Sequence, residues 1–487
     1  MQDEYRMTNT VIIAFKNFLW RFAERSGAQI IQFIVFIMLA RILEPEAFGT
    51  IAILMVFITI LQVFIDSGLG TALIQKKDAD NIDFSSVFYF NICICIFLYI
   101  LMFFSAPLIA SFYNDLSLVP LIRVLSLMLV ISGIRNIQQA YVSRNMLFKK
   151  FFFSTLGGTI VSAIVGITVA YKGYGVWALV IQQITKVSID TFILWVTVDW
   201  KPKLLFSFKK LRELFSYGWK LLVSALIDTT YNNLRQLIIG KLYTRIDLAY
   251  YNKGNAIPNL IIANVNSSID SILLPILSKE QDNISNVKNL TRKSIQLSTY
   301  IIAPIMIGMG VTSYSFVPLL LTEKWIPCIP FLWIFCITYI FYPIHTANLN
   351  AIKALGRSDL FLILEIWKKG FGLIILLSTM WYGVMIMAYS LLILSVLSQI
   401  INSWPNKKLL NYGYIQQIKD IMPSLILSLF MGFCMYLIKL MGFGLLLTFV
   451  LQIILGFIIY VIMSYVLNFE SFKYILNIMK KCIPKNI

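Results

Sequence analysis

One predicted helical face in the first apolar stretch of this 487-residue chain carries polar side chains at regular intervals. The intervals are four, four and three residues, and the residues are Arg21, Arg25, Gln29 and Gln32. At about 100° per residue they share one side of a helix, and Glu24 borders them. Guanidinium groups pair with phosphate in a planar, bidentate manner. The face therefore predicts binding of an anion.

A second polar face follows later in the chain, with the same spacing and one further turn. It consists of Lys220, Ser224, Asp228, Tyr231 and Arg235. Shifted by 199 residues, the two faces superpose, so that Arg21 corresponds to Lys220 and Gln29 to Asp228. Two such helices predict a wet, cationic cavity, because a long polar face cannot point at lipid.

Other ionisable residues fall inside apolar stretches and are further candidates for the lining of this cavity. They are Arg123, Arg135, Lys186, Asp190, Asp270, Glu365, Lys368 and Lys369. From the whole set we predict these substrate-binding residues: Arg21, Arg25, Gln29, Arg135, Lys220, Tyr231, Arg235 and Lys368. For coupling to an ion we predict Glu24, Asp228 and Asp270. We assign no catalytic residue.

Structural roles compete with the functional ones for the same residues. Long cationic side chains near a helix end can extend to the membrane surface, which applies to Arg21, Arg25 and Lys220. Acids and bases one turn apart can neutralise each other, as Lys186 with Asp190 and Glu365 with Lys369. Asp228 and Arg235, two turns apart, can also neutralise each other. Asp66 and Arg144 fit helix boundaries, Arg123 fits a helix end, and His345 fits a packed, hydrogen-bonded position.

The elements that position these residues are membrane-spanning helices. Hydrophobic residues make up 59% of the chain and charged residues only 13%, against about 25% in soluble domains. With roughly 20 residues per crossing, we expect about 14 spans. Their predicted ranges are 11–40, 48–66, 84–111, 118–142, 152–171, 175–198, 215–240, 248–275, 295–320, 328–352, 360–381, 384–403, 421–440 and 443–467.

The net charge of +18 is explained by topology rather than by nucleic acid. Loops on one side of the predicted spans hold roughly four times as many Lys and Arg residues as loops on the other. We therefore expect both termini in the cytoplasm and no nucleic-acid partner. The six cysteines lack metal-ligand spacing, so we expect no metal and no cofactor.

A weak internal repeat predicts the domain organisation. Residues 39–43 (LARIL) match residues 239–243 (IGKLY), and each run is followed by an acid and an apolar helix. An even number of spans separates the copies, so we expect two parallel six-helix lobes. The predicted fold is an all-α polytopic membrane protein with lobes at 1–200 and 201–403. Two further helices and a cytoplasmic tail occupy 404–487, and a central cationic cavity lies between the lobes.

Four segments carry a resemblance to a known family. They are the run WRFAERSGAQIIQFIVFIMLARILEPEAFG from Trp20, IDSGLGTALIQ at 65–75, YGVWALVIQQI at 174–184 and YYNKGNAIPNLI at 250–261. These resemble the polysaccharide transporter family of Wzx-type flippases, within the multidrug/oligosaccharidyl-lipid/polysaccharide superfamily. The resemblance implies fourteen spans, two six-helix lobes and alternating access. Related lipid II flippases bind pyrophosphate with cavity arginines, and either Arg21 or Arg25 lies on the matching helix.

The resemblance implies a substrate, partners and a location. The substrate would be an undecaprenyl-pyrophosphate-linked oligosaccharide repeat unit, flipped to the outer leaflet of a bacterial cytoplasmic membrane for surface polysaccharide. Membrane lipids, a polysaccharide polymerase and chain-length machinery would be partners, and an H⁺ or Na⁺ gradient would drive directed flipping. Two rivals remain open. A multidrug exporter would need acids and aromatics for cationic drugs, and a membrane polymerase or ligase would need a sizeable outer loop.

Overall fold

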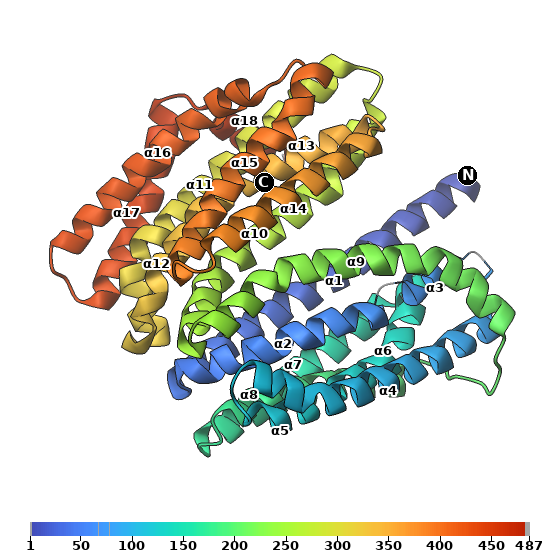
Figure 1. Ribbon diagram of the computed structural model, residues 1–487. Coiled ribbons are helices and arrows are strands. Elements are labelled where there is room, and N and C mark those ends of the chain that lie inside the picture. Colours follow the sequence, from blue (N-terminus) through green and yellow to red (C-terminus); the bar gives the residue numbers. More distant parts are fainter. Residues whose placement is uncertain (1, 67, 77, 483–487) are drawn as a thin grey trace. The chain divides into compact units, whose positions relative to one another are not determined.

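The computed structural model describes the backbone of residues 2–66, 68–76 and 78–482. It describes their side chains except at 2–19, 21, 22, 217 and 478–482. This part of the chain is all-α, as predicted (Figure 1). The helices of the first half are α1 (Gln2–Ile42), α2 (Pro45–Asp66), α3 (Leu69–Gln75), α4 (Asn81–Phe112), α5 (Leu118–Leu125), α6 (Leu127–Arg144), α7 (Phe148–Tyr171), α8 (Val176–Thr197) and α9 (Phe208–Leu242).

The second half continues with α10 (Arg245–Lys279), α11 (Ile284–Leu321), the 3-10 helix η1 (Glu323–Cys328), α12 (Ile329–Ile340) and α13 (Tyr342–Ala354). It ends with α14 (Ser358–Thr379), α15 (Val384–Leu409), α16 (Tyr414–Leu440), α17 (Leu445–Val466) and α18 (Glu470–Cys482).

Twelve helical segments among the described residues are long and apolar enough to cross a membrane. Two further helices, α9 and α14, coincide with the predicted spans 215–240 and 360–381 and have 35 and 22 residues. Both contain several ionisable residues within the predicted span. The chain is therefore a multi-pass membrane protein, and the count of 14 spans stays a prediction.

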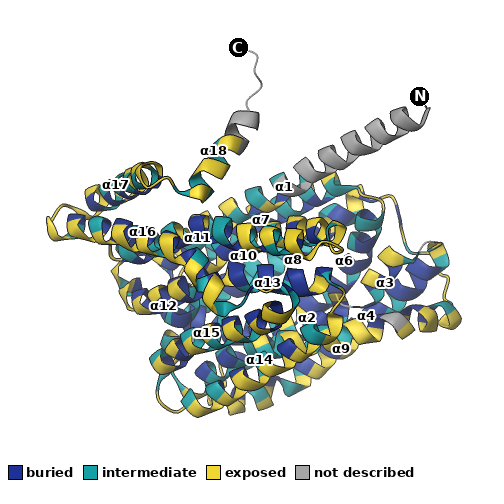
Figure 2. Cartoon of the chain, turned by 90° about the horizontal axis from the view of Figure 1, so that it is seen from above, coloured by how far each residue is buried: buried dark blue, intermediate teal, exposed yellow. Residues whose placement is uncertain are grey.

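The exposed faces of the helices are apolar, as lipid contact requires. On α17, Phe457, Tyr465 and Leu446 are 71%, 73% and 62% exposed, whereas Gln452 on the same helix is fully buried. Figure 2 shows the exposed residues of α16 and α17 as stripes along each helix. Apolar groups therefore cover the surface as well as filling the interior, and polar side chains such as Gln452 turn inward, away from lipid.

The contacts within the chain divide it into two compact units, residues 1–249 and 250–487. Unit 1 contains α1 to α9, because α9 packs against α2, α3 and α4. The predicted lobes at 1–200 and 201–403 follow the proposed repeat rather than packing, so their boundaries stay predictions. Each unit is described by itself below.

Helix boundaries recur along the chain in a way that supports the repeat. α1 ends at Ile42 and α2 begins at Pro45, while α9 ends at Leu242 and α10 begins at Arg245, which is a constant shift of 200 residues. The fourth span is broken in each half, at Ser126 between α5 and α6. The corresponding break in the second half falls at Phe341, between α12 and α13. Repeated, interrupted spans are common in transporters built from two related halves.

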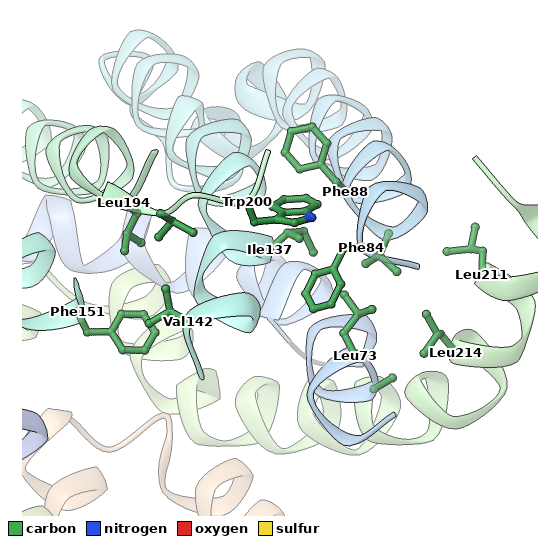
Figure 3. Packing of buried hydrophobic residues seen from close by; sticks show 13 residues of the cluster. Leu73, Phe84, Phe88, Ile137, Val142, Phe151, Leu194, Trp200, Leu211 and Leu214 are labelled. Carbon is green, nitrogen blue, oxygen red and sulfur yellow. The ribbon is translucent and has the colours of Figure 1, made fainter. Parts of the chain in front are cut away.

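The core of unit 1 is a cluster of aromatic and branched side chains at one end of its helices. Phe84 and Phe88 of α4 contact Trp200, with ring centroids 5.6 and 6.3 Å apart (Figure 3). Leu211 and Leu214 of α9 belong to the same cluster. Trp200 also donates its indole N–H to Asn81 at 3.2 Å. The cluster anchors α9 and the segment before it to α4.

In unit 2, α11 packs against α16 and α17. Pro304 lies inside α11, so the carbonyl of Tyr300 has no amide hydrogen four residues later to accept. The hydroxyl of Tyr460 on α17 donates to this carbonyl at 2.7 Å. The Tyr300 hydroxyl in turn donates to Ser464 at 2.7 Å. This reciprocal contact joins α17 to α11 at a point where a spanning helix lacks one of its own hydrogen bonds.

Candidate functional site

An ion pair joins two spans in the interior of unit 1. Arg135 of α6 lies 3.3 Å from Asp190 of α8, measured from Nη1 to Oδ2, and both side chains are mostly buried. A side chain at Gly158 of α7 would collide with the carboxylate of Asp190, so glycine there lets α7 and α8 pack closely. Within the described residues, Arg135 Nε and Asp190 Oδ1 have no hydrogen-bond partner. The ion pair therefore uses only part of its bonding capacity.

Two more carboxylates lie near this ion pair. Asp66, at the end of α2, accepts hydrogen bonds from Gln62 at 3.2 Å and from Asn136 at 3.1 Å. Glu24 of α1 is buried and accepts one from Thr155 at 3.0 Å. Glu24 also interacts electrostatically with Asp190, and Asp66 interacts with Arg135. Asp66 is thus part of the interior network as well as a helix boundary.

The residues of the predicted polar face of α1 differ in burial and do not all point the same way. Glu24 points into unit 1, Gln29 is half-buried, and Arg25 is exposed. Gln32 is exposed and lines a cavity described below. The side chain of Arg21 lies outside the described residues.

The predicted face of α9 is mixed. Lys220 and Asp228 are exposed, Tyr231 is half-buried and Arg235 is buried. Asp228 accepts a hydrogen bond from Asn232 of the same helix at 3.1 Å. An exposed acid and an exposed base on one helix remain accessible to a ligand.

In unit 2, Asp270 of α10 and Lys368 of α14 line one cavity of 350 Å³, together with His345 of α13. Asp270 accepts a hydrogen bond from Asn350 at 2.7 Å. Lys368 pairs with Glu365 at 2.5 Å, three residues earlier on the same helix. The spacing suggests Glu365 and Lys369 as a neutralising pair, and the structure shows Glu365 in contact with Lys368.

His345 is packed and hydrogen-bonded, as the sequence predicts. Its Nδ1 lies 3.3 Å from the amide nitrogen of Asn402 on α15. Its ring meets Tyr342 edge to face, with centroids 5.9 Å apart.

Arg123 and Arg144 have structural roles. Pro107 in α4 leaves the carbonyl of Phe103 without an intrahelical donor. Arg123 donates to that carbonyl at 3.3 Å and covers the Phe103 ring at 4.2 Å. Arg144 donates to the carbonyl of Leu73 at 2.8 Å and so caps the end of α3. The first of these residues had been a candidate for lining the cavity, and the second had been expected at a helix boundary.

No group of three or more His, Cys, Asp or Glu side chains that could hold a metal occurs in the described part of the chain. Charged side chains gather at two other places in the interior. One is the Arg135–Asp190 ion pair with Lys186 nearby, and the other is the cavity lined by Lys368 and Asp270. Both place cations inside helical bundles, where amide and hydroxyl groups surround them. Such surroundings can bind and release a polar, anionic group without covalent chemistry.

Residues 38–330, more than half of the chain, match the family described as polysaccharide biosynthesis protein. The chain belongs to this family.

Two curated relatives also carry names from polysaccharide biosynthesis. The chain is 26% identical over 383 residues to the teichuronic acid biosynthesis protein TuaB of Bacillus subtilis (strain 168), covering 76% of this chain and 77% of that one. It is 23% identical over 337 residues to the lipopolysaccharide biosynthesis protein WzxC of Escherichia coli (strain K12), covering 68% of each.

The fold of this polysaccharide biosynthesis protein is similar to that of solved transporters. An inward closed structure of the lipid II flippase MurJ matches with a TM-score of 0.74 and 18% identity, over 92% of this chain and 98% of that one. An inward-facing multidrug resistance transporter of the MATE family matches with a TM-score of 0.59 and 14% identity, over 82% and 95%. The fold class and the family expected from the sequence are confirmed.

The sequence did not indicate the uncharged partners in the interior. Asn136, Thr155, Asn350 and Asn402 each bond an ionisable candidate. Asn and Thr are common in polar loops, so only their position inside apolar runs distinguishes them. Polar residues in lipid-embedded helices face the interior, and applying that rule to uncharged residues would have found them.

Proposed function

We propose that this protein flips a polyprenyl-pyrophosphate-linked oligosaccharide from the cytoplasmic to the outer leaflet of a bacterial cytoplasmic membrane. The observation that carries the proposal is family membership in a multi-pass chain whose interior holds cations. A pyrophosphate-sugar head group is too polar to cross hydrocarbon unaided, and buried charge is costly unless it has a use. The protein would act as a transporter for surface polysaccharide synthesis rather than as an enzyme.

The mechanism would be alternating access, in which the head-group site opens first to the cytoplasm and then to the outside. Arg21, Arg25, Gln29, Arg135, Lys220, Tyr231, Arg235 and Lys368 are the proposed binding residues. Arginine is suited to the pyrophosphate because its forked donors match two phosphate oxygens. Arg135 contacts Asp190 through Nη1 alone, so its other donors could take a phosphate oxygen, and the head group would compete with Asp190 for this guanidinium.

Directed flipping requires an energy source. The membrane potential supplies about 2.3 kcal/mol per charge per 100 mV, so one coupled H⁺ or Na⁺ suffices for a useful bias. We propose Glu24, Asp228 and Asp270 as the coupling acids. If Asp228→Asn and Asp270→Asn both retain flipping with unchanged ion dependence, this assignment of coupling acids is wrong.

Both termini would lie in the cytoplasm, in keeping with the distribution of Lys and Arg in the loops. The outer-leaflet product would pass to a polysaccharide polymerase and to chain-length machinery. Lipids are partners in any case, because the apolar helix faces require them.

Flipping can be measured directly in proteoliposomes that contain the full-length protein and a fluorescent polyprenyl-pyrophosphate oligosaccharide. Sugar on the outer leaflet is oxidised by periodate, and the oxidised fraction rises with time if the protein flips the lipid. We expect charge reversal at Arg25 or Arg235 to abolish this rise. Lys172→Glu, an exposed cation at the end of α7, is the matched control and should retain it. Equal rates with and without protein would overturn the proposed function.

A further inference from the structure

Unit 1 contains a cavity of 240 Å³ that is separate from the Arg135–Asp190 contact. Four spans line it, namely α1, α2, α7 and α8. Its polar lining consists of Gln32, Gln182, Gln183, Lys186, Thr159 and Ser162. Gln182 and Gln183 belong to the YGVWALVIQQI segment, and nothing so far explains two adjacent amides within an apolar span.

The lining of the cavity carries a single type of charge, which is positive. Among the described residues that line it, Lys186 alone is charged. Lys186 is on α8, one turn before Asp190, and the two interact electrostatically. Asp190 makes its ion pair with Arg135, at 3.3 Å, rather than with Lys186. The ammonium of Lys186 therefore offers one positive charge to a ligand in the cavity.

The polar side chains that line the cavity offer both acceptors and donors of hydrogen bonds to a ligand. Thr159 donates its hydroxyl hydrogen to the Thr155 carbonyl at 2.6 Å, and Ser162 donates to the Thr159 carbonyl at 3.0 Å. Both oxygens keep lone pairs that can accept from a ligand hydroxyl. The glutamine amides supply donors and acceptors together. Gly166 of α7 leaves room for the Gln182 side chain, since a Cβ at position 166 would lie 2.9 Å from Gln182.

The rest of the lining is apolar and includes Phe36, Leu39 and Phe48. A ligand for this cavity thus has one negative charge, several hydroxyl groups and an apolar face. Its size is below the roughly 300–1,000 Å³ of pockets for drug-sized molecules, which suits one sugar ring. A pyrophosphate fits poorly, because it carries more charge and has no apolar face for the phenylalanines.

We infer that this cavity is a subsite for a single sugar unit bearing one carboxylate, held by Lys186 through its charge and by Gln32, Gln182 and Gln183 through its hydroxyl groups. The inference rests on the proposed function in one respect, since the sugar would belong to the flipped oligosaccharide. The cavity would then select for acidic repeat units over neutral ones.

Binding is tested with the full-length protein in nanodiscs and two matched probes, methyl β-D-glucuronide and methyl β-D-glucoside. We expect the glucuronide to bind about tenfold more tightly, as one charge-assisted contact implies. Lys186→Gln should make the two affinities equal, and Lys172→Gln should leave the preference intact. Equal affinities in the unchanged protein, no binding of the glucuronide, or a preference that survives Lys186→Gln would each overturn the inference.

A second variant covers the case in which Lys186→Gln fails to fold. Gln183→Leu keeps size and charge, and it should weaken both probes by about fivefold while keeping the preference for the glucuronide. Unchanged affinity for both probes in Gln183→Leu would contradict the subsite. Competition by inorganic phosphate as strong as by the glucuronide would show a general anion site and would also overturn it.

Flipping of two lipid-linked disaccharides, one with a uronate and one neutral, separates this inference from the proposed function. Lys186→Gln should slow the acidic substrate and spare the neutral one. If the protein flips both equally and Lys186→Gln slows neither, the subsite is wrong and the flippase stands. If it flips neither, the proposed function fails, and the nanodisc experiment still decides the subsite.

Discussion

The two units of the protein hold their interior charges in different ways. In unit 1, Arg135 on α6 contacts Asp190 on α8, so the ion pair joins two spans. In unit 2, Lys368 contacts Glu365 on the same helix, α14. A pair between helices constrains packing and must break if the helices separate, whereas a pair within one helix moves with it. The ion pair therefore ties two helices together in unit 1, whereas in unit 2 it lies within a single helix.

The largest difference should appear when one cation of each pair is removed. Arg135→Gln leaves the buried carboxylate of Asp190 without its partner, and we expect the free energy of unfolding to fall by about 3 kcal/mol. Lys368→Gln should lower it by less than about 1 kcal/mol, because the pair lies within one helix and Glu365 is partly exposed. Denaturant unfolding in detergent micelles measures both.

A rescue variant checks the reason for this difference. Adding Asp190→Asn to Arg135→Gln removes the unpaired charge and should recover most of the lost stability. Equal losses for Arg135→Gln and Lys368→Gln would mean that the pair in unit 1 does not restrain its helices.

The two units also differ in what satisfies a carbonyl left free by proline. Arg123 serves the Phe103 carbonyl in unit 1, and the buried hydroxyl of Tyr460 serves the Tyr300 carbonyl in unit 2. We expect Tyr460→Phe to cost about 1–3 kcal/mol of unfolding free energy, since it leaves a buried carbonyl unpaired. Tyr465→Phe, at an exposed position of the same helix, should cost almost nothing. Similar melting temperatures for the two variants would contradict this role of Tyr460.

A turn that recurs in both units allows a matched backbone test. Met146, between α6 and α7, and Gly356, between α13 and α14, have φ values of 54° and 73°. Gly356→Ala should destabilise the protein by about 1 kcal/mol, because a Cβ disfavours this conformation and no steric clash adds to it. Met146→Gly should change stability by less, since relief of strain is offset by greater freedom of the unfolded chain. Thermal unfolding distinguishes them, and a harmless Gly356→Ala would argue against the strain.

The smallest effect concerns pH at two helix starts. Asp80 caps α4 in unit 1, and its hydrogen bond from Lys210 lowers the pKa of that carboxyl to about 2. A lowered pKa means that this contribution to stability is complete above about pH 4 and is lost as the pH falls towards 2. Asn283 caps α11 in unit 2 and has no such dependence. Lys210→Gln should move the Asp80 titration back towards its ordinary pKa.

Carboxyl resonances of ¹³C-labelled aspartate would follow this titration by NMR. An unchanged midpoint in Lys210→Gln would show that the backbone hydrogen bonds at the start of α4 are sufficient to lower the pKa.

Several parts of the fold follow from composition and periodicity alone. The apolar runs predict the helices, and the match of residues 39–43 with 239–243 predicts the recurring turn at a shift of 200 residues. The break at Ser126 does not follow from the sequence, because it falls inside an apolar run. The break at Phe341 is signalled by Pro343, because proline favours the first turn of a new helix. A second turn also recurs in both halves. Its sequence is Tyr-Gly-Val at 174–176 and again at 382–384, and it is recognised as a repeat once the helix ends are known.

The candidate site was predictable only in part. The spacing on α1 and α9 identifies polar faces, but it does not distinguish buried Glu24 from exposed Arg25, one residue apart. Partners such as Arg135 and Asp190 are 55 residues apart. Their contact depends on how α6 and α8 pack, which periodicity within one helix does not reveal.

The bond between Tyr460 and Tyr300 bears on the order in which the chain is assembled. These residues are 160 positions apart, so α11 is synthesised and inserted well before α17 exists. Until then the Tyr300 carbonyl lies in the bilayer without its final donor, at a cost in free energy. The last spanning helix therefore completes the hydrogen bonding of an earlier one. Chains that end before Tyr460 would carry an α11 whose Tyr300 carbonyl lacks its donor from another helix.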